Sequence, residues 1–160
     1  MTTTPRTRTR LAASLVLFAL SSVAVVAPSV HANPRRGAEP TSDELGTRML
    51  ALVNRSRAAH GLPTLRLNER LTREALRHSK RMAHDGAITH TPNLADLVRS
   101  VGGSVFGEDL GKGRGLVGIR DAWMRRADTR RIMLDPRFHH VGLGVVHAGG
   151  FYWVTLQVFD

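Results

Sequence analysis

Apolar positions in the first half of the chain recur every three or four residues, a pattern that predicts amphipathic helices. The first predicted helix begins with Ser42 as its N-cap and ends before Gly61. Its inner face consists of five residues at helical spacing: Leu45, Met49, Leu52, Val53 and Ser56. The second begins with Asn68 as its N-cap and ends at Gly86. Its inner face consists of Leu71, Ala75, His78, Ser79 and Met82, where His78 is expected to be a hydrogen-bonded core residue.

The middle of the chain carries weaker signals. Residues 89–114 are expected to be mainly loops, with one short helix at 94–101. A third amphipathic helix is predicted over 116–126, with Ile119 and Trp123 on one face. Between them, residues 111–115 alternate glycine with Lys112 and Arg114. This run lacks the Gly-Lys-Ser/Thr ending of a phosphate-binding loop, so we interpret it as a mobile loop at the rim of a cleft, with cations that attract anionic ligands.

The last twenty residues have the composition of β-strands. Residues 141–146 and 152–159 are rich in β-branched and aromatic side chains, and the turn at 148–150 predicts that they form a hairpin. Both faces of the second strand are apolar, which is typical of a central strand covered on two sides. Together with the helices, this predicts an α+β fold, a three-layer α-β-α sandwich with the C-terminal hairpin in a central antiparallel sheet.

The first 32 residues have the layout of a secretory signal peptide. Three arginines precede an apolar run at 11–30, and Val30 and Ala32 occupy the −3 and −1 positions of a cleavage site. The alternative is a retained membrane anchor, but serines and Pro28 interrupt the run. We therefore expect a signal peptide at 1–32, a flexible leader at 33–41 and one domain at 42–160, secreted and without a transmembrane segment after cleavage.

Composition limits the chemistry that this domain can use. The chain has no cysteine, which excludes disulfides, thiolate metal sites and cysteine nucleophiles. The formal charge is +10, and loss of residues 1–32 with their three arginines would leave +7 on 128 residues. Four arginines form a stripe on the outer face of the second helix: Arg70, Arg73, Arg77 and Arg81. Aromatic residues are not interleaved with the basic ones, so nucleic acid is not an expected partner.

Four segments in a fixed order resemble the bacterial CAP superfamily, also called SCP-like. They are residues 52–65, 83–91, 107–109, and 134–138 followed by 141–145. The resemblance extends from about Leu45 to Asp160. It implies an α-β-α sandwich, usually secreted, with a shallow cleft built around two histidines and acidic residues.

Matched residue by residue, the resemblance places His90 at the first cleft histidine and Glu108 at the cleft acid. Asp109 stands where the family has asparagine, and Thr129 stands where it has the second histidine. The predicted cleft residues are therefore His90, Glu108, Asp109 and Thr129. A divalent metal held by His90 and Glu108 is an alternative, but a useful zinc site needs three protein ligands and a threonine hydroxyl is a poor one. We therefore expect no cofactor.

Three functions of different classes are compatible with these residues. The favoured one is a secreted, non-enzymatic, monomeric domain that binds a lipid or cell-envelope ligand at the His90–Glu108 cleft, because loss of the second histidine favours binding over catalysis. The first alternative is a peptidase-like hydrolase with His90 as general base and Glu108 as the acid that orients it. The second is an electrostatic binder of anionic envelope polymer through the arginine stripe.

Overall fold

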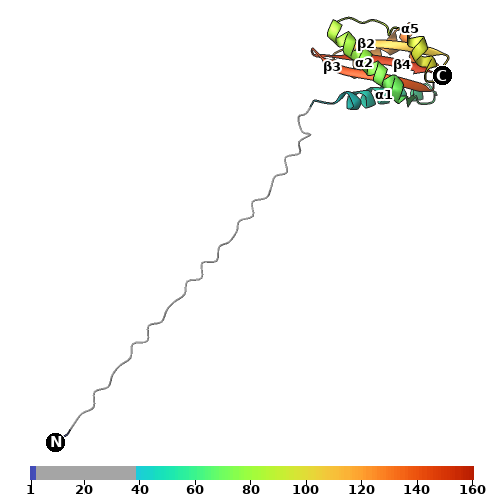
Figure 1. Cartoon of the computed structure of the whole chain (residues 1–160). Helices are drawn as coiled ribbons and strands as arrows, with labels where there is room; N and C mark the ends of the chain where they lie inside the picture. Colours follow the sequence, from blue (N-terminus) through green and yellow to red (C-terminus); the bar gives the residue numbers. More distant parts are fainter. Residues whose placement is uncertain (3–38) are drawn as a thin grey trace. The chain divides into compact units, whose positions relative to one another are not determined.

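The computed structural model describes residues 1–2 and 39–160, so the predicted signal peptide and most of the predicted leader lie outside the described residues. From residue 39 onwards the chain forms five helices and four strands (Figure 1). In chain order they are α1 (Ser42–Ala59), β1 (Arg66–Leu67), α2 (Glu69–Asp85), α3 (Leu94–Arg99), β2 (Phe106–Gly113), α4 (Leu116–Arg125), α5 (Ala127–Met133), β3 (His140–Ala148) and β4 (Phe151–Phe159).

The four strands form one sheet in the order β1-β3-β4-β2. β4 is paired with antiparallel neighbours on both sides, β3 and β2, while the short β1 adds a parallel edge next to β3. The predicted hairpin is confirmed: β3 and β4 pair along their whole length, and Gly149 and Gly150 between them adopt positive φ angles of 60° and 75°. The predicted central position of the last strand is also confirmed.

Helices cover both faces of this sheet, as the three-layer prediction requires. On one face, apolar side chains of β3 and β4 pack with α1, α4 and Met133 of α5 in the main core. On the other face lies α2, which Figure 1 shows across the strands, and its Leu71 joins α3 and Phe159 in a second cluster. The alternation of side chains along each strand separates these two cores.

The helix termini follow local capping chemistry. Thr41, and not Ser42 as predicted, is the N-cap of α1, because its side chain accepts a hydrogen bond from the backbone of Glu44 while the Glu44 carboxylate accepts one from the Thr41 backbone. This reciprocal pair is a capping box. Asn68 caps α2 as predicted, with its side chain accepting from the backbone N–H of Leu71 at 3.0 Å, and Gly86 ends α2 with a left-handed φ of 70°.

Two glycines of β3 let α2 lie directly on the sheet. A Cβ atom at Gly144 would lie 2.3 Å from the backbone of Ala75, and one at Gly142 would lie 2.5 Å from the side chain of Leu71. The hydroxyl of Ser79 bridges the same contact by donating to the backbone oxygen of Gly144 at 3.0 Å. The close approach therefore requires glycine at both strand positions.

Three elements differ from the prediction. Residues 106–113 form strand β2, where loops were expected, so the glycine-rich run at 111–115 is in part a paired strand and not a mobile rim loop. Its composition hides this, because it has no β-branched residue and the strand depends on continuous pairing with β4. Gly111 is required there, since a Cβ would lie 2.4 Å from Ile119. The short strand β1 and the helix α5 were not predicted either.

None of the helices described by the structure is long and apolar enough to cross a membrane.

Candidate functional site

A cavity of about 520 Å³ lies beside the edge strand β2, between it and helices α4 and α5. Its walls combine apolar side chains with the predicted polar residues. The lining consists of Ile88, His90, Glu108, Asp109, Leu110, Gly111, Lys112, Ile119, Ala122, Trp123, Arg126, Asp128, Thr129 and Ile132. The structure therefore brings all four predicted cleft residues to one cavity.

His90 and Glu108 are in direct contact. His90 Nδ1 lies 2.7 Å from Oε1 of Glu108, the distance of a strong hydrogen bond to a carboxylate. The two side chains differ in exposure: 77% of the His90 side chain is exposed, against 3% for Glu108. The imidazole is thus held at its Nδ1 side by a buried acid, with most of its ring facing solvent at the mouth of the cavity.

Two further hydrogen bonds reach Glu108, and a third joins the two residues that donate them. Its Oε1 accepts from the backbone N–H of Thr91 at 2.9 Å, and its Oε2 accepts from Nε2 of Gln157 at 3.0 Å. The Gln157 amide also donates to the Thr91 hydroxyl at 2.8 Å. Burial alone would raise the pKa of Glu108, but the bonds from Gln157, Thr91 and His90 outweigh it and hold the pKa below its usual value. Glu108 is therefore an ionised anchor that orients His90.

Asp109 follows Glu108 on β2, and its side chain points to the opposite face of the sheet. It is 1% exposed, and no donor among the described residues reaches either of its carboxylate oxygens. Burial, then the charges of Asp128 and Glu108, raise its pKa to about 8. Near neutral pH this carboxyl is consequently protonated, and it lines the cavity as a neutral hydroxyl donor and carbonyl acceptor.

Thr129 contributes little chemistry to the cavity. Its hydroxyl donates to the backbone oxygen of Trp123 at 2.7 Å, which closes the corner between α4 and α5. The indole of Trp123 in turn donates to the backbone oxygen of Leu110 on β2 at 2.9 Å. The position of the missing histidine therefore serves to hold α4, α5 and β2 together.

The arrangement supports orientation and contact more than bond cleavage. Within the described residues, no group of three or more His, Cys, Asp or Glu side chains converges as a metal site. The Thr129 hydroxyl is engaged with backbone, and the other hydroxyl near the pair, that of Thr91, is bonded to Gln157. Ile88, half exposed, adds an apolar edge to the mouth.

At the end of β2, the Lys112 ammonium lies over two aromatic rings of β4. It is 4.2 Å from the ring centroid of Trp153 and 5.0 Å from that of Phe151. The guanidinium carbon of Arg114 lies 5.3 Å from the Phe151 centroid. All three are cation–π distances. The sequence predicted that these two cations lie in a loop and attract an anionic ligand. In the structure they are held against aromatic rings of the hairpin.

The arginine stripe on α2 is largely engaged within the domain. Arg73 pairs with Glu69 and Arg77 pairs with Glu74, while Arg70 donates to the backbone oxygen of Ser100. The fourth member, Arg81, contacts Nδ1 of His78 at 3.2 Å. His78 is 2% exposed and its Nε2 bonds the Thr89 oxygen at 2.6 Å, as expected of a core histidine.

Sequence reasoning missed two residues that build the site, Gln157 and Thr91. Gln157 is fully buried in β4 between apolar neighbours, and it reaches Glu108 across the sheet because the two are register partners. A lone amide within a run of β-branched residues is the signal that could have found it, since such a group needs a buried partner. Thr91 directly follows His90 but carries no comparable signal.

The fold and the cleft define a class of protein, a three-layer sandwich domain with a histidine–glutamate cleft at one edge of its sheet. A family model described as the cysteine-rich secretory protein family, CAP, matches residues 50–159. The chain therefore belongs to the CAP family, although it contains no cysteine.

Individual relatives agree with this family. The uncharacterized protein YkwD of Bacillus subtilis is 30% identical over 112 residues, which are 66% of this chain and 44% of that protein. An extracellular protein of Bacillus anthracis with an SCP domain has a TM-score of 0.64 at 22% identity, over 78% of this chain and 45% of that one. An outer surface protein of Borrelia burgdorferi has a TM-score of 0.66 at 13% identity, over 78% of this chain and 98% of that one. The chain thus spans less than half the length of YkwD.

Proposed function

We propose that this CAP domain acts outside the cell and binds a lipid, or another apolar ligand of the cell envelope, in the cavity beside β2 without altering it covalently. The observation that carries the proposal is the composition of the cavity wall. Ile119, Trp123 and Ile132 form an apolar surface, and His90 stands at its mouth with most of its ring exposed. Such a site, mostly apolar with a few placed polar groups, is typical of small-molecule binding.

The polar groups of the cavity support binding over hydrolysis. The bonds to Glu108 leave it as a fixed anchor, and the hydroxyl at position 129 is used to close a helix corner. A hydrolase that uses His90 as a base would have to activate a water molecule without a second histidine and without an evident oxyanion hole. Protonated Asp109 adds one hydrogen-bonding group deep in an otherwise apolar wall.

The proposed location rests on the relatives and on the predicted signal peptide. The Bacillus anthracis relative is described as extracellular, and the Borrelia burgdorferi relative is described as an outer surface protein. Residues 1–32 carry the basic, apolar and small-residue regions of an export signal. A domain at the cell surface meets lipid and envelope components directly.

The test uses oleate and oleyl alcohol as probes, with binding measured by the change in tryptophan fluorescence, to which Trp123 in the cavity wall and Trp153 both contribute. Ile88→Asp should weaken binding at least tenfold, because it places a charge at the apolar mouth. Val117→Asp is the matched control, since Val117 is 54% exposed, against 50% for Ile88, and does not line the cavity. Equal affinity of both variants and the native domain, or release of a cleavage product from an ester probe that His90→Ala abolishes, would contradict the proposal.

A further inference from the structure

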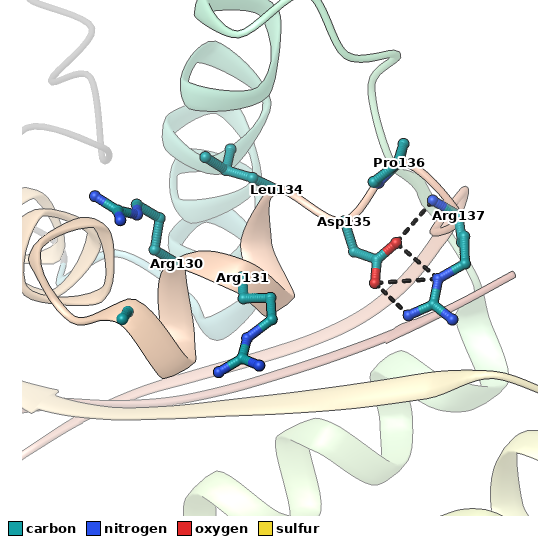
Figure 2. Close-up of a pocket in the computed structure, with 7 residues that line it drawn as sticks. Arg130, Arg131, Leu134, Asp135, Pro136 and Arg137 are labelled. Atoms are coloured by element: carbon teal, nitrogen blue, oxygen red, sulfur yellow. Dashed lines mark hydrogen bonds and ion pairs between the residues drawn. The ribbon is translucent and has the colours of Figure 1, made fainter.

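A second hollow, of about 430 Å³, lies between α5 and the loop that follows it. Its lining consists of Ala127, Arg130, Arg131, Leu134, Asp135, Pro136 and Arg137. None of these residues lines the cavity beside β2, so the hollow is a separate site. Figure 2 shows Arg130 and Arg131 projecting from α5 in different directions, with Asp135 and Arg137 on the loop beyond Leu134, so both arginine side chains have to turn toward a shared ligand.

The hollow has an excess of positive charge. Three guanidinium groups and one carboxylate line it, which leaves two positive charges. Arg137 is bonded to Asp135 through Nε at 3.0 Å and through Nη2 at 2.6 Å, so this pair is internally neutral. Within residues 39–160, neither Arg130 nor Arg131 has a side-chain hydrogen bond or ion pair. The other acid of α5, Asp128, is already bonded to Arg126 at 3.0 Å.

The backbone that carries these arginines is held from inside the domain. The buried guanidinium group of Arg57 donates to the backbone oxygens of Met133 and Asp135 at 2.9 and 3.1 Å. The Asp135 carboxylate also accepts from the backbone N–H of Arg137 at 3.0 Å, which tightens the turn. The end of α5 and the loop therefore form a fixed frame, and a ligand would not have to order them on binding.

From this arrangement we propose that the hollow binds a phosphate group, with Arg130 and Arg131 as its principal ligands and Arg137 at its edge. A phosphate monoester carries close to two negative charges at neutral pH, which matches the two uncompensated guanidinium groups. Guanidinium groups bind phosphate oxygens through paired N–H donors, so two of them can engage one tetrahedral group. Because Asp135 and Arg137 neutralise each other, the net charge of the hollow is two positive charges, which matches a dianion. Their pairing also keeps the Asp135 carboxylate from forming an ion pair with Arg130 or Arg131.

The same phosphate chemistry is available from a soluble ester or from a lipid headgroup, and the experiment has an arm for each. The full domain is titrated with glycerol 3-phosphate by calorimetry, and it is sedimented with phosphatidylcholine vesicles that contain phosphatidic acid, whose headgroup is also a phosphate monoester. Arg130→Gln/Arg131→Gln should weaken binding at least tenfold in whichever arm binds, and it should reduce the dependence of binding on salt. Thermal unfolding checks that the variant is folded.

The matched control is Arg73→Gln/Arg77→Gln on α2, which removes the same charge from two arginines that already have acidic partners. This control should bind as the native domain does. Binding of the soluble ester places a small phosphate compound in the hollow, and binding of the vesicles alone places a lipid headgroup there. Absence of binding in both arms, or an equal loss in the control, would overturn the proposal. Since the hollow and the cavity share no residue, this outcome is independent of the oleate result.

Discussion

Arg57 Nη2 in α1 donates a hydrogen bond of 2.9 Å to the backbone oxygen of Phe138, in the loop before β3. The guanidinium group is completely buried, and its other donors reach the backbone oxygens of Pro63, Met133 and Asp135. One side chain thus satisfies four carbonyl groups, one in the loop after α1 and three between the end of α5 and the start of β3. A residue type that is almost always exposed is here the internal link between α1 and the segment that frames the phosphate hollow.

Replacing Arg57 by methionine should therefore destabilise the domain strongly. Methionine fills much of the volume but leaves four backbone oxygens without their donor, and each unsatisfied buried group costs about 1–3 kcal/mol. For four such groups we expect a total loss of at least about 4 kcal/mol in the free energy of unfolding, measured by urea denaturation. Arg55→Met, at an exposed position on the same helix, is the control and should change stability by less than about 0.5 kcal/mol. Similar losses for both would contradict the interpretation.

Asp109→Asn should stabilise the domain increasingly as pH rises. The folded state keeps the Asp109 proton up to a pKa of about 8, whereas the unfolded chain loses it near 3.8. Between these values the folded state binds more protons, so the stability of the native domain falls with rising pH by at most about 1.4 kcal/mol per pH unit. Asparagine has no such proton and escapes the loss.

The measurement is urea denaturation of Asp109→Asn and native domain at pH 5, 7 and 9. The free energy of unfolding of Asp109→Asn, relative to that of the native domain, should rise from pH 5 to 7 and level off above pH 8. Asp96→Asn, at an exposed position on α3, serves as the control and should show no such trend. Parallel pH curves for the native domain and Asp109→Asn would show that the carboxyl is not protonated in the fold.

Glu108→Gln should have the opposite pH dependence. Because hydrogen bonds hold the pKa of Glu108 below 4.5, its stabilising contribution is present above that pH and is lost as pH falls through the folded pKa. At pH 7 the variant should be less stable by about 1–3 kcal/mol, since the amide cannot accept all the bonds that the carboxylate accepts. The deficit should shrink at pH 3. Glu69→Gln, on the exposed first turn of α2, is the control; a deficit unchanged at low pH would count against the ionised anchor.

Gly144→Ala should disrupt the contact between α2 and the sheet. The added Cβ would lie 2.3 Å from backbone atoms of Ala75, which cannot move without shifting the whole helix. Such overpacking lowers the free energy of unfolding by about 1–3 kcal/mol, and we expect a loss at the upper end of this range. It is measured as a fall in melting temperature. Gly118→Ala in α4, where nothing lies within 4 Å, should instead leave stability unchanged or raise it by up to about 1 kcal/mol. A harmless Gly144→Ala would mean that α2 sits further from β3.

Much of the fold was predictable because its signals are local. The apolar stripes of α1 and α2, the N-cap at Asn68 and the turn at Gly149 and Gly150 each depend on a few neighbouring residues. β2 and Arg57 were not predictable in this way. The strand is imposed by pairing with β4, some fifty residues later, and the arginine gains its role from carbonyl groups of separate loops.

The candidate site divides in the same manner. The resemblance to the family predicted the positions of His90, Glu108, Asp109 and Thr129, and the structure brings them to one cavity; their part in ligand binding stays a prediction. The unpartnered state of Asp109 and the bond from Thr129 to Trp123 depend on packing between β2, α4 and α5. The spacing of residues in the sequence does not predict such packing, because residues on three separate elements determine it together.

The position of β4 has a consequence for how the domain is made. This strand follows β2 and β3 in the chain, yet each of them pairs with it and not with the other. A growing chain can therefore build its helices early, but the sheet has no centre until Phe151–Phe159 has been synthesised. The hydrogen bond from Gln157 to Glu108 likewise cannot form until β4 has been synthesised. A chain cut before β4 would therefore carry every predicted cleft residue, but it would lack the strand that pairs with β2 and the amide that fixes Glu108.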